Sequence, residues 1–155
     1  MSDTLKDSLQ ADLTTAMKAR DELRSATLRM VLTAVRAEEV AGKSARTLSD
    51  EEVTTVLQRE AKKRREAAEA FAGAGRAEQG ERETAELSVI ETYLPTPLTD
   101  EELDALVDEA VLVATAEGLT GMGAMGAVMS QLKPKVGARA DGKRLSTAVR
   151  ARLQA

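Results

Sequence analysis

The stretch that decides the fold runs from Gly118 to Gly142 and reads GLTGMGAMGAVMSQLKPKVGARADG. It predicts a glycine-spaced helix bearing methionines, then a Lys-Pro-Lys break, a Gly-X-Arg-X-Asp-Gly turn and a basic final helix. Residues 118–155 hold seven basic residues and one acidic residue, in a protein whose formal net charge is −4. Basic residues concentrated in one segment are typical of surfaces that bind polyanions.

Three motifs in this stretch resemble the C-terminal signature of the YqeY family: residues 125–129 (MGAVM), 132–136 (LKPKV) and 137–143 (GARADGK). Further matches follow the family's order upstream, at residues 28–30 (LRM), 48–53 (LSDEEV), 62–66 (KKRRE) with Phe71, and 91–95 (ETYLP). The family is similar to the helical tail of the B subunit of the tRNA-dependent Asp/Glu amidotransferase. The resemblance covers nearly the whole chain and implies an all-helical, two-part protein related to a tRNA-contacting tail.

The composition excludes several kinds of chemistry. The chain has no cysteine and no histidine, so a disulfide, a thiolate zinc site, a cysteine nucleophile and a histidine general base are all ruled out. Carboxylate or lysine chemistry remains open, and we expect neither a metal nor a cofactor. Phe71 and Tyr93 are the only aromatic residues, which favours close helix packing over a β-sandwich.

Nothing in the chain suggests a membrane segment. No apolar run approaches the ~20 residues that a membrane span needs, and no apolar signal segment follows Met1. We therefore expect a soluble, cytoplasmic protein.

Apolar residues at helical spacing, together with capping residues, predict an all-α fold. Expected caps are Asp21, Ser49 with Glu52 in a capping box, and Thr99. A polar turn is expected between Gly73 and Gly80. The seven expected helices span residues 2–19, 21–41, 49–72, 81–94, 99–117, 122–132 and 141–153.

The clearest boundary is Pro95-Thr96-Pro97, because proline cannot continue a helix. It predicts an N-terminal helical domain of two hairpins, residues 1–94, and a three-helix C-terminal domain, residues 95–155, with a linker at about 95–98. Residues 95–117 hold seven acidic residues and no basic ones, so the C-terminal part is expected to be strongly dipolar.

The sharpest binding hypothesis concerns the start of the last helix. Asp141 is expected to be its N-cap rather than a catalytic acid, and no catalytic residue is assigned. Basic side chains near a helix N-terminus favour anions, which makes a phosphate contact one reading and simple solvation the other. The proposed RNA contacts are Lys133, Lys135, Arg139, Lys143 and Arg144.

A second basic run is a weaker candidate. Lys62, Lys63 and Arg65 are possible additional contacts, but four consecutive basic residues cannot all face one ligand. The alternative is a solvated face with Glu60–Arg64 and Arg65–Glu69 ion pairs.

Several other residues are expected to have structural roles. Gly123 and Gly126 are expected to let another backbone approach closely, with a smooth RNA-facing surface as the alternative. Tyr93 is expected to pack the two parts together rather than stack on a base, and Arg29 to pair with Glu52, Glu60 or another carboxylate between helices. The remaining members of this structural set are Pro95, Pro134, Gly137, Asp141 and Gly142.

By resemblance, the preferred function is a non-catalytic accessory protein that binds tRNA or another structured RNA. Its protein partners would then include a tRNA-dependent amidotransferase or an aminoacyl-tRNA synthetase. With so few aromatic residues, RNA contacts would be to phosphate and shape. Two alternatives stay open: a helical protein–protein adaptor, which the net acidity favours, and the carbon–nitrogen ligase activity that the family's relatives suggest.

Overall fold

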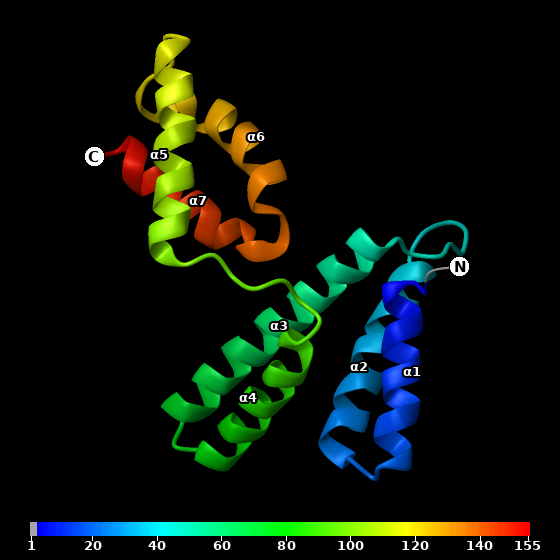
Figure 1. The fold of residues 1–155 in the computed structure, drawn as a ribbon. Helices are drawn as coiled ribbons and strands as arrows, with labels where there is room; N and C mark the ends of the chain where they lie inside the picture. The colour runs from blue at the N-terminus through cyan, green and yellow to red at the C-terminus, as the bar shows by residue number, and fades with distance from the viewer. Residues whose placement is uncertain (1–2) are drawn as a thin grey trace. The chain divides into compact units, whose positions relative to one another are not determined.

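The computed structural model describes residues 3–155, and within that range it contains seven α-helices and no strand (Figure 1). The all-α prediction is therefore confirmed. The helices are α1 (Leu5–Lys18), α2 (Glu22–Glu39), α3 (Asp50–Gly73), α4 (Ala77–Glu91), α5 (Asp100–Ala116), α6 (Met125–Val136) and α7 (Gly142–Leu153). Two short 3-10 helices, η1 (Gly121–Ala124) and η2 (Gly137–Arg139), flank α6.

The chain divides into two compact units, Met1–Leu94 and Pro95–Ala155. We call them the N-terminal unit and the C-terminal unit. The N-terminal unit contains α1 to α4 and the C-terminal unit contains α5 to α7. Each unit has its own hydrophobic core.

The helix starts are set by local side-chain chemistry. The side chains of Asp21, Ser49, Thr99 and Asp141 each accept a hydrogen bond from a backbone N–H three residues on, as their sequence positions predict. The predicted start of the first helix at Ser2 lies outside the described residues. Within them, α1 begins at Leu5 behind a capping box formed by Thr4 and Asp7.

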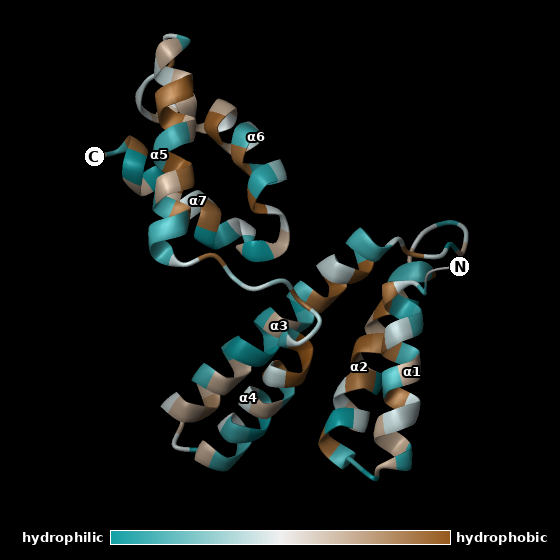
Figure 2. Ribbon diagram, in the orientation of Figure 1, coloured by the Kyte–Doolittle hydropathy of each residue, from teal (hydrophilic) through white to brown (hydrophobic). Residues whose placement is uncertain are grey.

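In the N-terminal unit, α1 pairs with α2 and α3 pairs with α4, giving two helical hairpins (Figure 1). Hydrophobic and hydrophilic residues alternate along each of these helices, as expected for amphipathic helices that share a core (Figure 2). Helix α2 contacts all three other helices and contributes much of this core. The fully or almost fully buried side chains are Leu9, Leu28, Val31, Leu32, Val35, Leu48, Val53, Val56, Leu57, Ala61 and Ile90.

The predicted polar turn from Gly73 to Gly80 is wrong in its second half. Helix α4 begins at Ala77, and Gly80 lies buried within its first turns. A Cβ atom at Gly80 would lie 3.3 Å from the Ala68 carbonyl oxygen of α3 and 3.6 Å from the Cβ of Phe71. Gly80 is therefore the position where two helix backbones approach each other, a role that local sequence does not distinguish from a turn.

A buried group of charges joins α3 to α4, where the sequence suggests a solvated face. Arg64 is 8% exposed, and its guanidinium lies 2.9 Å from Glu60 Oε1 and 3.5 Å from Glu86 Oε2. Its Nη2 also contacts the sulfur of Met30 on α2, while its buried Nε makes no hydrogen bond. We call Glu60, Arg64 and Glu86 the buried charge cluster.

The predicted Glu60–Arg64 pair is thus confirmed, but as an interior pair. Arg29 was expected to make the interhelical ion pair, and this is wrong. Arg29 is exposed and pairs with no carboxylate among residues 3–155, because the arginine that points between the helices is Arg64. No Arg65–Glu69 pair forms within the described chain, and both side chains are exposed.

Glu39 ties three segments of the N-terminal unit together. Its carboxylate accepts hydrogen bonds from Lys6 Nζ of α1 at 2.7 Å and from the Leu48 N–H of the following loop at 3.2 Å. These two bonds hold the pKa of Glu39 below its usual range, with the Lys6 bond the larger cause. The Glu39 backbone carbonyl accepts from Arg46, which closes the loop between α2 and α3.

This arrangement predicts a pH dependence. A carboxyl group whose pKa is lower in the folded state stabilises the fold above its unfolded pKa, and that stabilisation disappears as the pH falls through the folded value. We expect Glu39→Gln to lower the free energy of unfolding at pH 7, with the difference from the parent protein shrinking at acidic pH. Denaturant titrations at a series of pH values would measure it, and a difference that is constant with pH would contradict this account.

In the C-terminal unit, α5 contacts both α6 and α7, and α6 contacts α7. Leu103, Val107 and Ala110 of α5 meet Val128 and Leu132 of α6 in the core, which also includes Leu145 and Val149 of α7. Leu98 closes one end of this core, and its N–H donates to the Arg139 carbonyl at 2.9 Å.

The predicted Lys-Pro-Lys break is wrong. Helix α6 continues through Pro134 to Val136, and the chain turns at Gly137, whose φ and ψ are 54° and −131°. Pro134 is exposed and lies in the last turn, so the carbonyl that loses a partner there can bind water. Glycine conformation, rather than proline, ends the helix.

No single helix within residues 3–155 is both long and apolar enough to cross a membrane. Helices Asp100–Ala116 and Gly121–Arg139 meet the length and composition criteria only as a pair, and that pair is bent by 99°.

Candidate nucleic-acid interface

The start of α7 is occupied by its own cap. Asp141 Oδ1 accepts a hydrogen bond of 2.7 Å from the Arg144 N–H, as the sequence predicts for an N-cap. The capping carboxylate places a negative charge where a phosphate would have to approach. An anion binding at this helix N-terminus would therefore have to compete with Asp141.

Arg139 and Arg144 are both engaged with α5 and the segment that precedes it. Arg139 Nε donates to the Thr96 carbonyl at 2.9 Å, and its Nη2 lies 3.2 Å from Glu102 Oε2. Arg144 Nη2 lies 2.9 Å from Asp100 Oδ1. These two arginines connect the start of α5 to η2 and α7, so in the structure they stabilise the packing of the C-terminal unit.

Two further ion pairs connect the acidic helix to its neighbours. Lys135 Nζ of α6 lies 4.0 Å from Glu109, and Arg152 Nε of α7 lies 2.6 Å from Asp108. The acidic helix therefore neutralises four of the seven basic residues of the following segment within the unit. These side chains are exposed or, in the case of Arg144, partly exposed, so each pair contributes only about 0–1 kcal/mol and can exchange its partner for another anion.

Three basic side chains of the C-terminal unit keep their charge unpaired. Lys133, Lys143 and Arg150 are exposed, and none makes an ion pair within the described residues. Lys143 and Arg150 stand seven positions apart on α7 with exposed Thr147 between them, so they share one helix face. The predicted RNA contacts omit Arg150. Its spacing of seven residues from Lys143 in a predicted helix already indicated that both side chains lie on the same polar face.

The three weaker candidate RNA contacts on α3, Lys62, Lys63 and Arg65, differ in their interactions with neighbouring residues. Lys62 and Arg65 are exposed and unpaired within the described residues, while Lys63 Nζ lies 3.0 Å from Glu60. Arg64, between them, points inward. The four basic residues therefore face different directions, as helical geometry requires.

The close approach predicted at Gly123 and Gly126 is not found. Both residues are exposed, and a Cβ atom at either position would have no atom of another residue within 4 Å apart from its own helix backbone and chain neighbours. Packing in the C-terminal unit therefore does not require glycine at these positions. Gly126 and exposed Ser130 and Lys133 follow one another at helical spacing on α6.

Tyr93 is held within the N-terminal unit. Its hydroxyl donates to Asp12 Oδ2 at 2.5 Å and accepts from Arg24 Nη2 at 3.1 Å, and the Arg24 guanidinium carbon lies 6.0 Å from the ring centroid. Burial, with the hydrogen bond to Asp12 next, raises the pKa of Tyr93 to about 12. The Tyr93 hydroxyl is therefore hydrogen-bonded to residues of α1 and α2, and its ring contacts Arg24 of α2.

Within the described part of the chain, no three His, Cys, Asp or Glu side chains are grouped so that they could hold a metal ion. Ion pairs, helix caps and unpaired surface cations make up the polar chemistry of the C-terminal unit.

Comparison with known proteins gives two findings. The model of a family described as "Yqey-like protein" matches residues 6–153. The chain is also 43% identical over 63 residues to the E subunit of the glutamyl-tRNA(Gln) amidotransferase of Thermococcus gammatolerans. That match covers 38% of this chain and 10% of the relative, so the chain corresponds to a small fraction of the relative's length.

Proposed function

Because this chain belongs to the Yqey-like protein family, we propose that it is a non-catalytic accessory protein that binds tRNA or another structured RNA. The observation that carries the proposal is the set of unpaired cations on α6 and α7, Lys133, Lys143 and Arg150, in a chain that resembles part of a glutamyl-tRNA(Gln) amidotransferase. In this proposal the protein works alongside tRNA-dependent amidation.

The contacts would be made to phosphate. Lysine and arginine side chains that neutralise phosphates release counterions, and this release drives sequence-independent binding. Lys135 joins the set because its 4.0 Å pair with Glu109 is weak and exposed. Arg139 and Arg144 bind RNA only after exchanging their α5 carboxylates for phosphate, so their first role is to position the start of α7.

The test is tRNA binding across a salt series from about 50 to 200 mM. We expect the triple variant Lys133→Ala, Lys143→Ala, Arg150→Ala to weaken binding roughly 100-fold at low salt. It should also reduce the slope of log affinity against log salt by about 2 to 3, because each lost phosphate contact removes about one unit.

A charge-matched control removes three exposed basic residues of the N-terminal unit, by Lys18→Ala, Arg36→Ala and Arg76→Ala. The control should retain most of the parent affinity. A third variant, Lys62→Ala with Lys63→Ala and Arg65→Ala, measures the contribution of α3. Equal losses in all three variants would show only general electrostatic attraction, and no binding by the parent at low salt would refute the proposal.

A helical protein–protein adaptor is the second candidate, and one observation favours it. Four apolar side chains near the end of α5 and at η1 are exposed: Leu112 at 68%, Val113 at 43%, Leu119 at 37% and Met122 at 47%. Exposed apolar side chains close together in the chain are typical of surfaces that contact other proteins. Failure of RNA binding would make this the leading function.

A further inference from the structure

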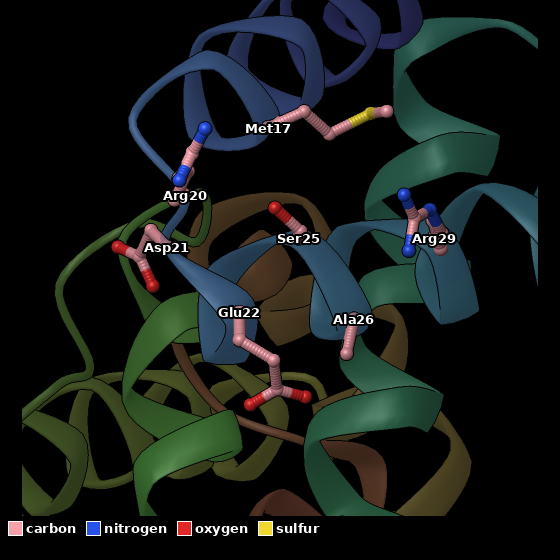
Figure 3. Close-up of a pocket in the computed structure, with 7 residues that line it drawn as sticks. All are labelled: Met17, Arg20, Asp21, Glu22, Ser25, Ala26 and Arg29. Atoms are coloured by element: carbon pink, nitrogen blue, oxygen red, sulfur yellow. The ribbon is translucent and has the colours of Figure 1, made fainter.

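The N-terminal unit contains a hollow of about 350 Å³ beside the turn between α1 and α2 (Figure 3). Met17 of α1, Arg20 of the turn, and Ser25 and Arg29 of α2 are among the residues that line it. In Figure 3 the Arg20 and Arg29 side chains lie on opposite sides of the Ser25 hydroxyl. All the residues that line it belong to α1, α2 and the turn between them.

In the turn between α1 and α2, Arg20 occupies a backbone position that is usually taken by glycine, and its side chain lies at the edge of the hollow. Arg20 has φ of 58°, and its N–H bonds to the Met17 carbonyl at 3.1 Å, while the Asp21 N–H bonds to the Ala16 carbonyl at 2.9 Å. This is the helix-ending arrangement in which a glycine ordinarily takes the left-handed position. Arginine there has an unfavourable backbone conformation, and its side chain lines the hollow.

Three side-chain donors around the hollow have no hydrogen-bond partner among residues 3–155. Neither the Arg20 nor the Arg29 guanidinium makes a hydrogen bond or ion pair with another residue in the range 3–155. The Ser25 residue is only 6% exposed, and its hydroxyl also lacks a hydrogen bond within this range. Ser25 Oγ is not among the buried side-chain atoms that lack a partner in the described residues, and Arg20 and Arg29 are exposed, so all three side chains can donate to a ligand that enters from solvent.

The acceptors that line the hollow are already used. Asp21 Oδ1 accepts from the Arg24 N–H at 3.1 Å, as the cap of α2. Both Glu22 oxygens accept from the Arg82 guanidinium of α4, at 2.9 and 3.1 Å. The hollow therefore offers two positive charges without an ion-pair partner in the described residues, and Glu22 is paired with Arg82. The capping carboxylate of Asp21 keeps its negative charge, so an anion bound here would have to compete with Asp21 for Arg20.

We propose that this hollow binds a small organic oxyanion, a carboxylate or phosphate monoester, through Arg20, Arg29 and the Ser25 hydroxyl. Guanidinium groups bind both oxyanions by two parallel N–H···O bonds. Met17, half exposed, and Ala26 supply the apolar lining against which a short hydrocarbon group packs. The size of the hollow falls within the range of small-molecule sites.

The test uses phenyl phosphate, benzoate and inorganic phosphate as probes, with uncharged benzamide as the negative probe. Binding to the full chain is followed by calorimetry and by the amide NMR shifts of α1, α2 and α7. We expect saturable binding of at least one aromatic oxyanion, with shifts confined to the α1–α2 turn and the first half of α2. Preference between phenyl phosphate and benzoate distinguishes the two sources of the oxyanion.

Three substitutions test the named groups. Arg20→Gln and Arg29→Gln should each weaken binding about tenfold or more, because a charge-assisted hydrogen bond is lost, and Ser25→Ala should weaken it less. Arg36→Gln is the matched control, since Arg36 is exposed on the same helix seven residues beyond Arg29 and does not line the hollow.

Arg20→Gly separates a binding role from a structural one. Glycine relieves the left-handed backbone conformation, so this variant should unfold at a higher temperature while binding the probe about tenfold more weakly.

Several results would overturn the proposal. These are no saturable binding at about 10 mM probe, equal loss in the Arg36→Gln control, unchanged affinity in the Arg20 and Arg29 variants, or NMR shifts on α7 instead of α2. The Arg20 and Arg29 variants could instead bind tRNA more weakly while their binding of the probe is unchanged. That result would assign these arginines to RNA binding and would refute the small-oxyanion proposal. The proposed RNA function can fail without affecting this result.

Discussion

Replacing Arg64 by methionine should lower the free energy of unfolding of the N-terminal unit by about 3–5 kcal/mol. Arg64 is the only cation of the buried charge cluster, and it lies between Glu60 and Glu86. Methionine has a similar length, so the substitution removes the charge while retaining much of the volume. Two buried carboxylates would then face each other, each with only one other cation, Lys63 or Arg82.

The measurement can be restricted to the correct unit. Tyr93 is the only tyrosine, the chain has no tryptophan, and Tyr93 packs within the N-terminal unit. Its fluorescence during denaturant unfolding therefore reports on that unit, while far-UV circular dichroism reports on both.

Two controls sharpen the Arg64 result. Arg65→Met removes the same charge from the next position, which is exposed, and should change stability by less than about 0.5 kcal/mol. Adding Glu60→Gln and Glu86→Gln to Arg64→Met should recover part of the loss, because neutral amides are cheaper to bury than unpaired carboxylates. Equal effects of Arg64→Met and Arg65→Met would show that the buried charge cluster is not what stabilises the α3–α4 contact.

The second large effect concerns the glycine that ends α6. Gly137→Ala should destabilise the C-terminal unit by roughly 2–3 kcal/mol, because φ of 54° with ψ of −131° is a conformation that residues with a Cβ atom rarely adopt. Relaxing this strain would also move η2, from which Arg139 bonds to Thr96 and Glu102.

Gly142→Ala is the matched control for Gly137→Ala. Gly142 is the first residue of α7, has no positive φ, and has open space around its missing side chain. Alanine there should be neutral or stabilise the unit by up to about 1 kcal/mol. Far-UV melting curves would separate the two variants, and a Gly137→Ala melt that matches the parent protein would contradict the strain account.

Local sequence determined the helices and most of their starting points. Caps such as Ser49, Thr99 and Asp141 act within three residues, so the chain order alone shows where a free N–H group finds an acceptor. The buried residues Val53, Val56, Leu57 and Ala61 likewise recur at helical spacing along α3. The motifs along the chain also identified the family that the comparison found.

Only the tertiary structure decided which glycines and which charges serve packing. Gly80, Gly123 and Gly126 all lie in helical segments, but of the three only Gly80 has a neighbouring helix close enough to crowd an added Cβ atom. In the same way, Arg64 is buried and Arg65 exposed because a step of one residue rotates a helical side chain by about 100°. Helix–helix contact, absent from the local pattern, then determines which direction is the interior.

The candidate RNA surface shows the same division. The sequence identified a basic segment that follows an acidic one, but four of its seven basic side chains pair with α5 once the unit folds. Residue type fixes how much charge a segment carries. The distances that folding sets between opposite charges decide how much of it remains for a partner, because Coulomb attraction depends on separation in space rather than along the chain.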